Sequence, residues 1–175
     1  MKSHVILTVL GSDRPGLTQA LADGVLAAGG NWLESRLSQL GGKYVGSVLV
    51  EIEDDARNTL EEEVRKIDAT GLRVVIVQAE QERGEVGKVM WFELVGQDRP
   101  GIVREVTSVL TGLGVNIEDM ETSLEMGAWS GERLFRAELR LSLPDGTTSD
   151  DVQAALEAIS GEIMVDFTIN APARA

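Results

Sequence analysis

Apolar residues follow two different spacings along the first half of the chain. Val5 to Leu10 is a mostly apolar run of strand length, and from Pro15 onward apolar residues recur every four positions, as on one face of a helix. Two more strand patterns follow, at Asn31 to Leu40 and at Lys43 to Glu53. A second helical face and a β-branched strand complete this half. They are carried by Leu60, Val64 and Ile67 and by Leu72 to Ala79.

Residues typical of turns and helix ends separate these segments. Pro15 is expected in the first helical turn, where its missing N–H removes no intrahelical hydrogen bond. Gly29-Gly30 ends that helix, and Gly41-Gly42 suits a tight hairpin between the two middle strands. Asp54-Asp55 offers caps for the second helix. The predicted order is therefore strand, helix, strand, strand, helix, strand.

The second half repeats the first with a shift of 85 residues. The motif Gly-Ser-Asp-Arg-Pro-Gly-Leu at 11–17 recurs as Gly-Gln-Asp-Arg-Pro-Gly-Ile at 96–102, and the same shift carries Gly29-Gly30-Asn31 onto Gly114-Val115-Asn116. Strands are expected at Lys88–Val95, Val115–Met126, Glu132–Leu143 and Glu162–Ile169. The helices are marked by Ile102, Val106, Val109 and Leu113, and, after Thr148-Ser149-Asp150, by Val152, Leu156 and Ile159.

This element order predicts an α+β protein made of two ferredoxin-like βαββαβ modules in tandem, with antiparallel sheets and the helices on one face. We expect a first module at 1–80, a linker at 81–87, a second module at 88–170 and a tail at 171–175. Strand residues such as Val48, Val50, Ile52 and 74–77 suggest sheets that are apolar on both faces. Such a sheet needs a partner, either the other repeat or a second chain, so a homodimer is expected.

Composition narrows the function classes. The chain has no cysteine, which excludes disulfides, zinc-thiolate sites and thiol catalysis. The net charge of −13 repels a phosphate backbone. Direct nucleic-acid binding is therefore not expected, and any effect on a gene would pass through a protein partner. No segment is long and apolar enough to span a membrane and no signal peptide is evident, so we expect a cytoplasmic protein.

The repeated Asp-Arg-Pro-Gly loop is the candidate site, because it joins a strand to a helix start. Free N–H groups at a helix start attract a carboxylate, and glycine lets a ligand approach the backbone. The aspartate suits an ammonium group, and the asparagine that opens the next strand can donate and accept. A free amino acid fits these groups. The candidate ligand-binding residues are Asp13, Arg14, Gly16, Asn31, Asp98, Arg99, Gly101, Ile102 and Asn116.

An ordinary turn explains the same loop, because aspartate before Pro-Gly also bonds its own backbone at a helix start. Retention in both copies favours a site, although the fold alone could demand the same residues twice.

The module order, with Asp-Arg-Pro-Gly opening the helix and Gly-x-Asn following it, resembles the ACT domain. Residues 10–16 with 31–37, and Ser130-Gly131-Glu132-Arg133-Leu134-Phe135, are similar to the glycine cleavage system transcriptional repressor family. The resemblance implies regulation by amino acids, glycine first, held at interfaces between paired modules. It also implies action on a protein partner such as a transcription activator. Trp32 stands where a small aliphatic residue is usual, whereas Ile117 keeps the pattern. We therefore expect the second site to be the active one.

Features of a catalyst are absent from the sequence: there is no Walker loop and no Gly-x-Ser-x-Gly turn. No cofactor and no metal site are expected, and the single histidine, His4, is interpreted as structural. Two other readings stay open: an interaction module without a working ligand site, and a small hydrolase using carboxylates alone. Trp129, in a hairpin about four residues longer than its counterpart, either anchors a partner or folds over the core.

Overall fold

The computed structural model describes residues 1–80, 87–127, 131–159 and 164–168, the last segment for its backbone only. The chain divides into two compact units, Met1–Glu82 and Arg83–Ala175. The division falls inside the segment expected to be a linker. The predicted tail lies outside the described residues, as does Trp129.

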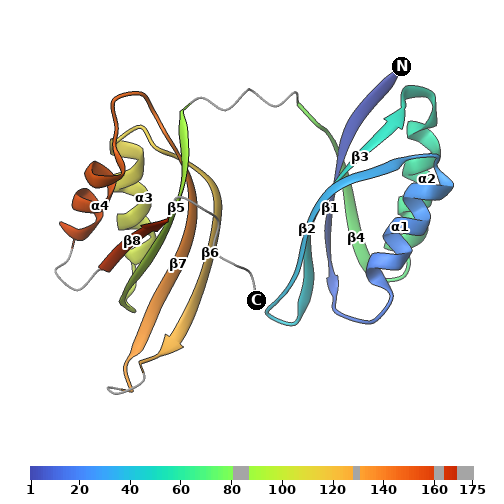
Figure 1. Cartoon of the computed structure of the whole chain (residues 1–175). Helices are drawn as coiled ribbons and strands as arrows, with labels where there is room; N and C mark the ends of the chain where they lie inside the picture. The colour runs from blue at the N-terminus through green and yellow to red at the C-terminus, as the bar shows by residue number, and fades with distance from the viewer. Residues whose placement is uncertain (81–86, 128–130, 160–163, 169–175) are drawn as a thin grey trace. The chain divides into compact units, whose positions relative to one another are not determined.

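The first unit is a four-stranded antiparallel sheet in the order β2-β3-β1-β4, with two helices on one face (Figure 1). Its elements are β1 (Lys2–Ser12), α1 (Leu17–Ala27), β2 (Asn31–Leu40), β3 (Lys43–Glu53), a short 3-10 turn η1 (Asp54–Ala56), α2 (Arg57–Asp68) and β4 (Leu72–Gln78).

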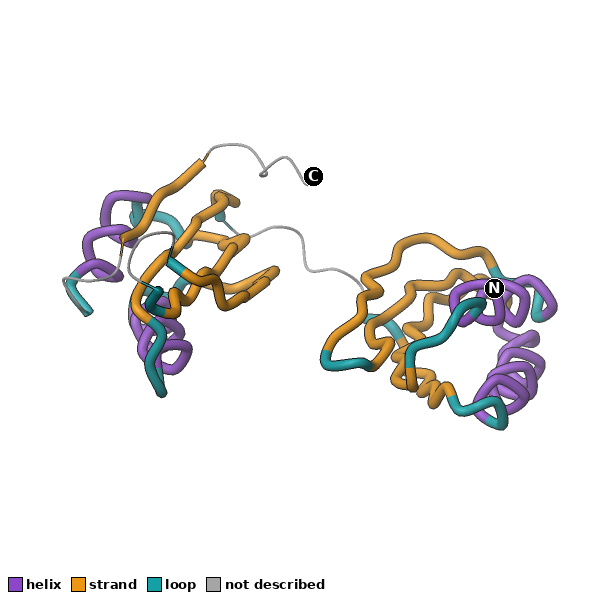
Figure 2. The backbone as a smooth tube through the Cα atoms, turned by 90° about the horizontal axis from the view of Figure 1, so that it is seen from below, coloured by secondary structure: helices purple, strands orange, loops and turns teal. Residues whose placement is uncertain are grey.

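The second unit repeats this arrangement, with its strands in the order β6-β7-β5-β8. Its elements are β5 (Lys88–Gln97), α3 (Ile102–Gly112), β6 (Asn116–Met126), β7 (Arg133–Leu143), α4 (Ser149–Glu157) and β8 (Met164–Thr168). Figure 2 shows that in each unit the helices form one layer and the strands the other. The predicted fold class, two βαββαβ modules in tandem, is confirmed.

Each unit has its own hydrophobic core between its sheet and its helices. Along β1, Val5, Leu7 and Val9 are buried, and the residues between them are more exposed. This is the period of two that a strand with one covered face requires. The two core clusters draw on separate units: one contains Leu21 and Leu60, the other Phe92. Each module can therefore bury a core from its own residues.

The open face of the first sheet is less apolar than the sequence suggested. Val48, Val50 and Ile52 all point toward the helices and belong to the core, because they alternate with more exposed residues along β3. The strand β4 carries valines on both faces: Val74 is buried, whereas Val75 and Val77 remain 46% and 50% exposed. A run of consecutive valines in the sequence does not separate these two directions.

Two helix starts differ from the expectations. Pro15 lies before α1 rather than in its first turn, because Gly16 is the N-cap residue in a left-handed conformation. Asp54 and Asp55 form the 3-10 turn η1 and do not cap α2, whose N-cap is Ala56 without a side-chain bond. The helix α4, by contrast, begins with a complete capping box at Thr148.

Thr148→Ala is expected to lower the free energy of unfolding of the second unit by about 1 kcal/mol. The Thr148 hydroxyl accepts a hydrogen bond from the Asp151 backbone N–H at 3.2 Å, and the Asp151 carboxylate accepts one from the Thr148 backbone N–H at 2.9 Å. The hydrogen bonds from Thr148 lower the pKa of the Asp151 carboxyl. The contribution of the Asp151 carboxylate to the stability of the second unit is therefore present at neutral pH and is lost when acid protonates the carboxylate.

Urea unfolding followed by circular dichroism measures this loss. Thr147→Ala is the matched control, since it removes the neighbouring hydroxyl and leaves the capping box intact. Equal losses in the two variants would contradict a specific role for the cap.

Candidate functional site

Gly16 and Gly101 occupy the same left-handed backbone position in the two loops. Each is the N-cap residue of its helix, α1 or α3, with φ of 90° and 91°. Glycine adopts this left-handed region without steric cost, and other residues rarely do. A Cβ built on either glycine would meet no protein atom within 4 Å. The backbone conformation therefore requires the glycine, and the space beside it is open.

In the first loop, both charged side chains bond to neutral groups. The Asp13 carboxylate accepts a hydrogen bond from Gln39 Nε2 at 2.8 Å, and the Arg14 guanidinium donates to the carbonyl of Thr70, also at 2.8 Å. Among the described residues neither Asp13 nor Arg14 has an ion pair. Both charges are thus positioned without being neutralised.

A second set of polar side chains surrounds the start of α1. The hydroxyls of Thr18 and Tyr44 share a hydrogen bond of 2.6 Å, and Lys43 donates to the Ser12 hydroxyl at 3.0 Å. Tyr44 lies opposite Gln39 in the pairing of β2 with β3. At the loop end of the first sheet, three successive elements, α1, β2 and β3, therefore each carry polar side chains.

In the second loop, the equivalent charges are paired. The Arg99 guanidinium donates two hydrogen bonds to the Glu105 carboxylate, at 2.7 and 2.5 Å, and these lower the pKa of Glu105. Asp98 lies 3.4 Å from an Arg133 guanidinium nitrogen. The fourth candidate of this loop, Ile102, is only 4% exposed and packs in the core. Its side chain is therefore part of the hydrophobic core and is not exposed in the loop.

The asparagines lie at the other end of each sheet. Asn31 pairs with Glu51, whereas the loop follows Ser12, which pairs with Lys43. From Lys43 to Glu51 a strand covers about 26 Å at roughly 3.3 Å per residue. Asn116 is placed in the same way, opposite Ser142. A single module therefore does not bring loop and asparagine together.

Trp32 also lies at the end away from the loop. It pairs with Val50 and packs against the core of the first unit. It therefore does not narrow the loop of its own module, which was the reason for preferring the second site.

Sequence reasoning did not single out Gln39, Tyr44 and Thr18, although all three surround the first loop. The search for residues shared by the two repeats could not find them. The positions that correspond to them in the second unit hold apolar residues, so no shared motif marked them. They are Leu124, Phe135 and Val103.

Neither a metal nor a membrane is indicated by the described part of the chain. No group of three or more histidine, aspartate or glutamate side chains there is arranged to hold a metal ion. No helix in that part is both long and apolar enough to cross a bilayer.

The first half of the chain matches a known domain family. Residues 3–76 match the model of the ACT domain. The match spans almost the whole of the first unit. The second unit repeats the element order, the sheet topology and the Asp-Arg-Pro-Gly loop of the first. The chain therefore carries two ACT-type modules in tandem, and the resemblance noted in the sequence is confirmed.

Whole-chain comparisons agree with the tandem arrangement. The glycine cleavage system transcriptional repressors of Escherichia coli (strain K12) and Shigella flexneri are each 22% identical over 172 residues, covering 95% of this chain and 89% of theirs. A crystal structure of a protein of unknown function from Galdieria sulphuraria has 25% identity and a TM-score of 0.78, covering 98% of this chain and 100% of that one.

A second solved structure, attributed to a glycine cleavage system transcriptional repressor, has 16% identity and a TM-score of 0.71. It covers 97% of this chain and 99% of its own. At that identity the likeness concerns the fold alone. Similarity to the repressors and the ACT domain together support a regulatory, amino-acid-sensing role.

Proposed function

We propose that this protein is a cytoplasmic regulator that binds a free amino acid and acts on transcription through a protein partner, without catalysis and without direct contact with nucleic acid. The similarity to the repressors and the match of the first unit to the ACT domain support regulation. The net charge of −13 supports action through a protein, since an acidic surface repels a phosphate backbone.

The observation that carries the proposal is the set of contacts made by the charged side chains of the first loop. Asp13 and Arg14 are held by neutral partners, so their charges remain available, and the space beside Gly16 is open. A ligand carboxylate would bind at the start of α1, where the helix dipole is positive. Its ammonium group would bind Asp13. Glycine and serine are small enough to leave the surrounding polar side chains in place.

The first loop is now the preferred site. Binding at the second loop would compete with the Arg99–Glu105 and Asp98–Arg133 ion pairs. We assign Asn31 and Asn116 no part in a site built by one module, because each lies at the far end of its sheet.

Asp13→Asn is expected to weaken glycine or serine binding about tenfold or more, since a hydrogen bond to a charged group contributes about 1.5–3 kcal/mol. Calorimetric titration of the full chain measures the loss. Asp23→Asn, in the helix α1 that follows the loop and also exposed, is the matched control and should bind as the unaltered protein does. Absence of any amino-acid binding, or equal binding by the Asp13 and Asp23 variants, would refute the proposal.

A second candidate is an interaction module that assembles with its partner regardless of any amino acid. Exposed apolar residues near the second loop favour it: Leu124 is 54% exposed and Met126 68%. In that case, capture of the partner would not change when glycine or serine is added. The exposed valines of β4 also fit a homodimer, which sedimentation equilibrium tests.

A further inference from the structure

An open groove of about 700 Å³ crosses the uncovered face of the first sheet, at the end away from the Asp-Arg-Pro-Gly loop. Ile6 and Leu49 form its apolar floor, and Ser47 continues that floor. Arg36 and Glu34 line it from β2, and Lys2 lines it from the start of β1. Ligand pockets have this size and this mixture of an apolar floor with a few charged groups.

The pairing of the strands explains why this face is hollow. Glu34, Leu49 and Ile6 form one row across β2, β3 and β1, and Arg36, Ser47 and Thr8 form the next. Long charged side chains stand at the edge, whereas short ones stand in the middle. A depression between them follows directly from side-chain length.

The second unit provides an internal comparison. The corresponding rows are Asp119, Arg140 and Trp91, followed by Glu121, Glu138 and Glu93. Large side chains therefore occupy the middle of this sheet. Arg140 also forms an ion pair of 3.3 Å with Glu118. The two sheets share one fold, and the matching rows of the first sheet carry smaller side chains in the middle than those of the second.

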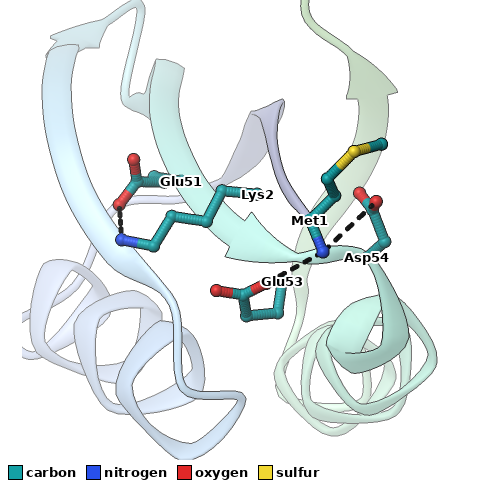
Figure 3. A network of polar contacts seen from close by, with 5 residues as sticks. All are labelled: Met1, Lys2, Glu51, Glu53 and Asp54. Carbon is teal, nitrogen blue, oxygen red and sulfur yellow. Dashed lines mark hydrogen bonds and ion pairs between the residues drawn. The ribbon is translucent and has the colours of Figure 1, made fainter.

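The charges around the groove form a short, less exposed contact at one end and a longer, more exposed one at the other. Lys2 Nζ lies 2.7 Å from Glu51 Oε1, and this hydrogen bond raises the pKa of Lys2 and lowers that of Glu51 (Figure 3). Both groups therefore stay charged. At the other end Arg36 Nε lies 3.7 Å from Glu34 Oε1, and these two side chains are 53% and 60% exposed.

We propose that this groove is a second amino-acid site, which takes a free amino acid with an aliphatic side chain. The Arg36–Glu34 pair presents opposite charges side by side, as the carboxylate and ammonium of an amino acid do. The ligand carboxylate would bind Arg36, its ammonium would bind Glu34, and its side chain would lie on Ile6 and Leu49. Opening an exposed ion pair costs little, about 0–1 kcal/mol.

Ile6→Trp tests the groove, because it installs the residue that the second unit carries at the matching position. L-leucine is the probe, and titration calorimetry of the full chain is the measurement. We expect leucine affinity to fall at least about tenfold, since the indole fills the floor. Val75→Trp is the matched control: it adds the same ring on the same face, outside the groove, and should leave affinity unchanged. 4-Methylpentanoate, which lacks the ammonium, should bind far more weakly than leucine.

If the Ile6 variant binds leucine as well as the unaltered chain does, the groove is not an amino-acid site. If the Ile6 variant does not fold, Ser47→Glu, again taken from the second unit, takes its place. This inference rests on the proposed amino-acid response, and Asp13→Asn separates the two. Loss of leucine binding in the Asp13 variant alone places leucine at the loop and refutes the groove. Loss of leucine binding in the Ile6 variant alone supports the groove. Absence of glycine and serine binding by the unaltered chain refutes the loop without bearing on the groove.

Discussion

Replacing Phe92 by alanine should remove about 3–5 kcal/mol from the stability of the second unit. Phe92 is 2% exposed, lies on the helix-facing side of β5 and pairs with Leu139 of β7. Truncation removes a large apolar surface and leaves a cavity that the surrounding strands fill only in part. A small domain has about 5–15 kcal/mol of stability in total. The second unit of this variant should therefore be close to unfolding at room temperature.

Trp91→Ala is the matched control, because Trp91 is the next residue and points to the opposite, uncovered face of the same strand. It is only partly buried, so its truncation should cost clearly less. Urea unfolding, with the near-ultraviolet signal as a probe of packing, measures both losses. Equal losses would mean that the uncovered face of this sheet is as well packed as the core.

The Phe92 variant also tests whether the units are energetically separate. The two core clusters share no residue, and each lies within one unit. The transition of the first unit should therefore keep its midpoint when the second unit is destabilised. A parallel shift of both transitions would show that the two units unfold together.

The fold could be predicted from the sequence because its signals are local. The bounds of β2 and β3, Asn31–Leu40 and Lys43–Glu53, agree with the predicted ones. Gly41 and Gly42 between them both have positive φ, as a two-residue hairpin turn requires. Alternation with a period of two and a pair of glycines are read directly along the chain. The duplication then confirmed each element a second time.

The arrangement of the site could not be predicted, because it depends on pairing between distant residues. Asn31 follows α1 closely in sequence, yet strand pairing puts it at the opposite end of the sheet from Asp13. Gln39 reaches Asp13 only because β2 returns along β3 to the loop. Neither relation has a sequence signature. The repeat also misled in one respect, since shared residues drew attention away from the polar cluster that only the first unit has.

Gly46→Ala should cost the first unit about 3 kcal/mol or more, which is unusual for the addition of one methyl group. Gly46 lies within β3, between Val9 on one side and Leu37 on the other, with φ of 147°. A Cβ at this position would lie 1.9 Å from the carbonyl oxygen of Arg36. Because that oxygen belongs to the backbone of β2, a side-chain rotation cannot relieve the overlap. The sheet itself must move.

Gly29→Ala separates strain from overlap. Gly29 has a positive φ of 71°, but a Cβ there meets no atom within 4 Å, so its replacement should cost about 1–2 kcal/mol from backbone strain alone. Thermal and urea unfolding of both variants give the difference. The second unit carries the buried Ala137 at the position that matches Gly46, opposite Leu94 and Thr122. A loss at Gly46 no larger than that at Gly29 would therefore mean that the first sheet can relax to the backbone of the second. A larger loss would show that the close approach of β2 to β3 is a fixed feature of the first unit, and this approach positions both Gln39 beside the loop and Arg36 beside the groove.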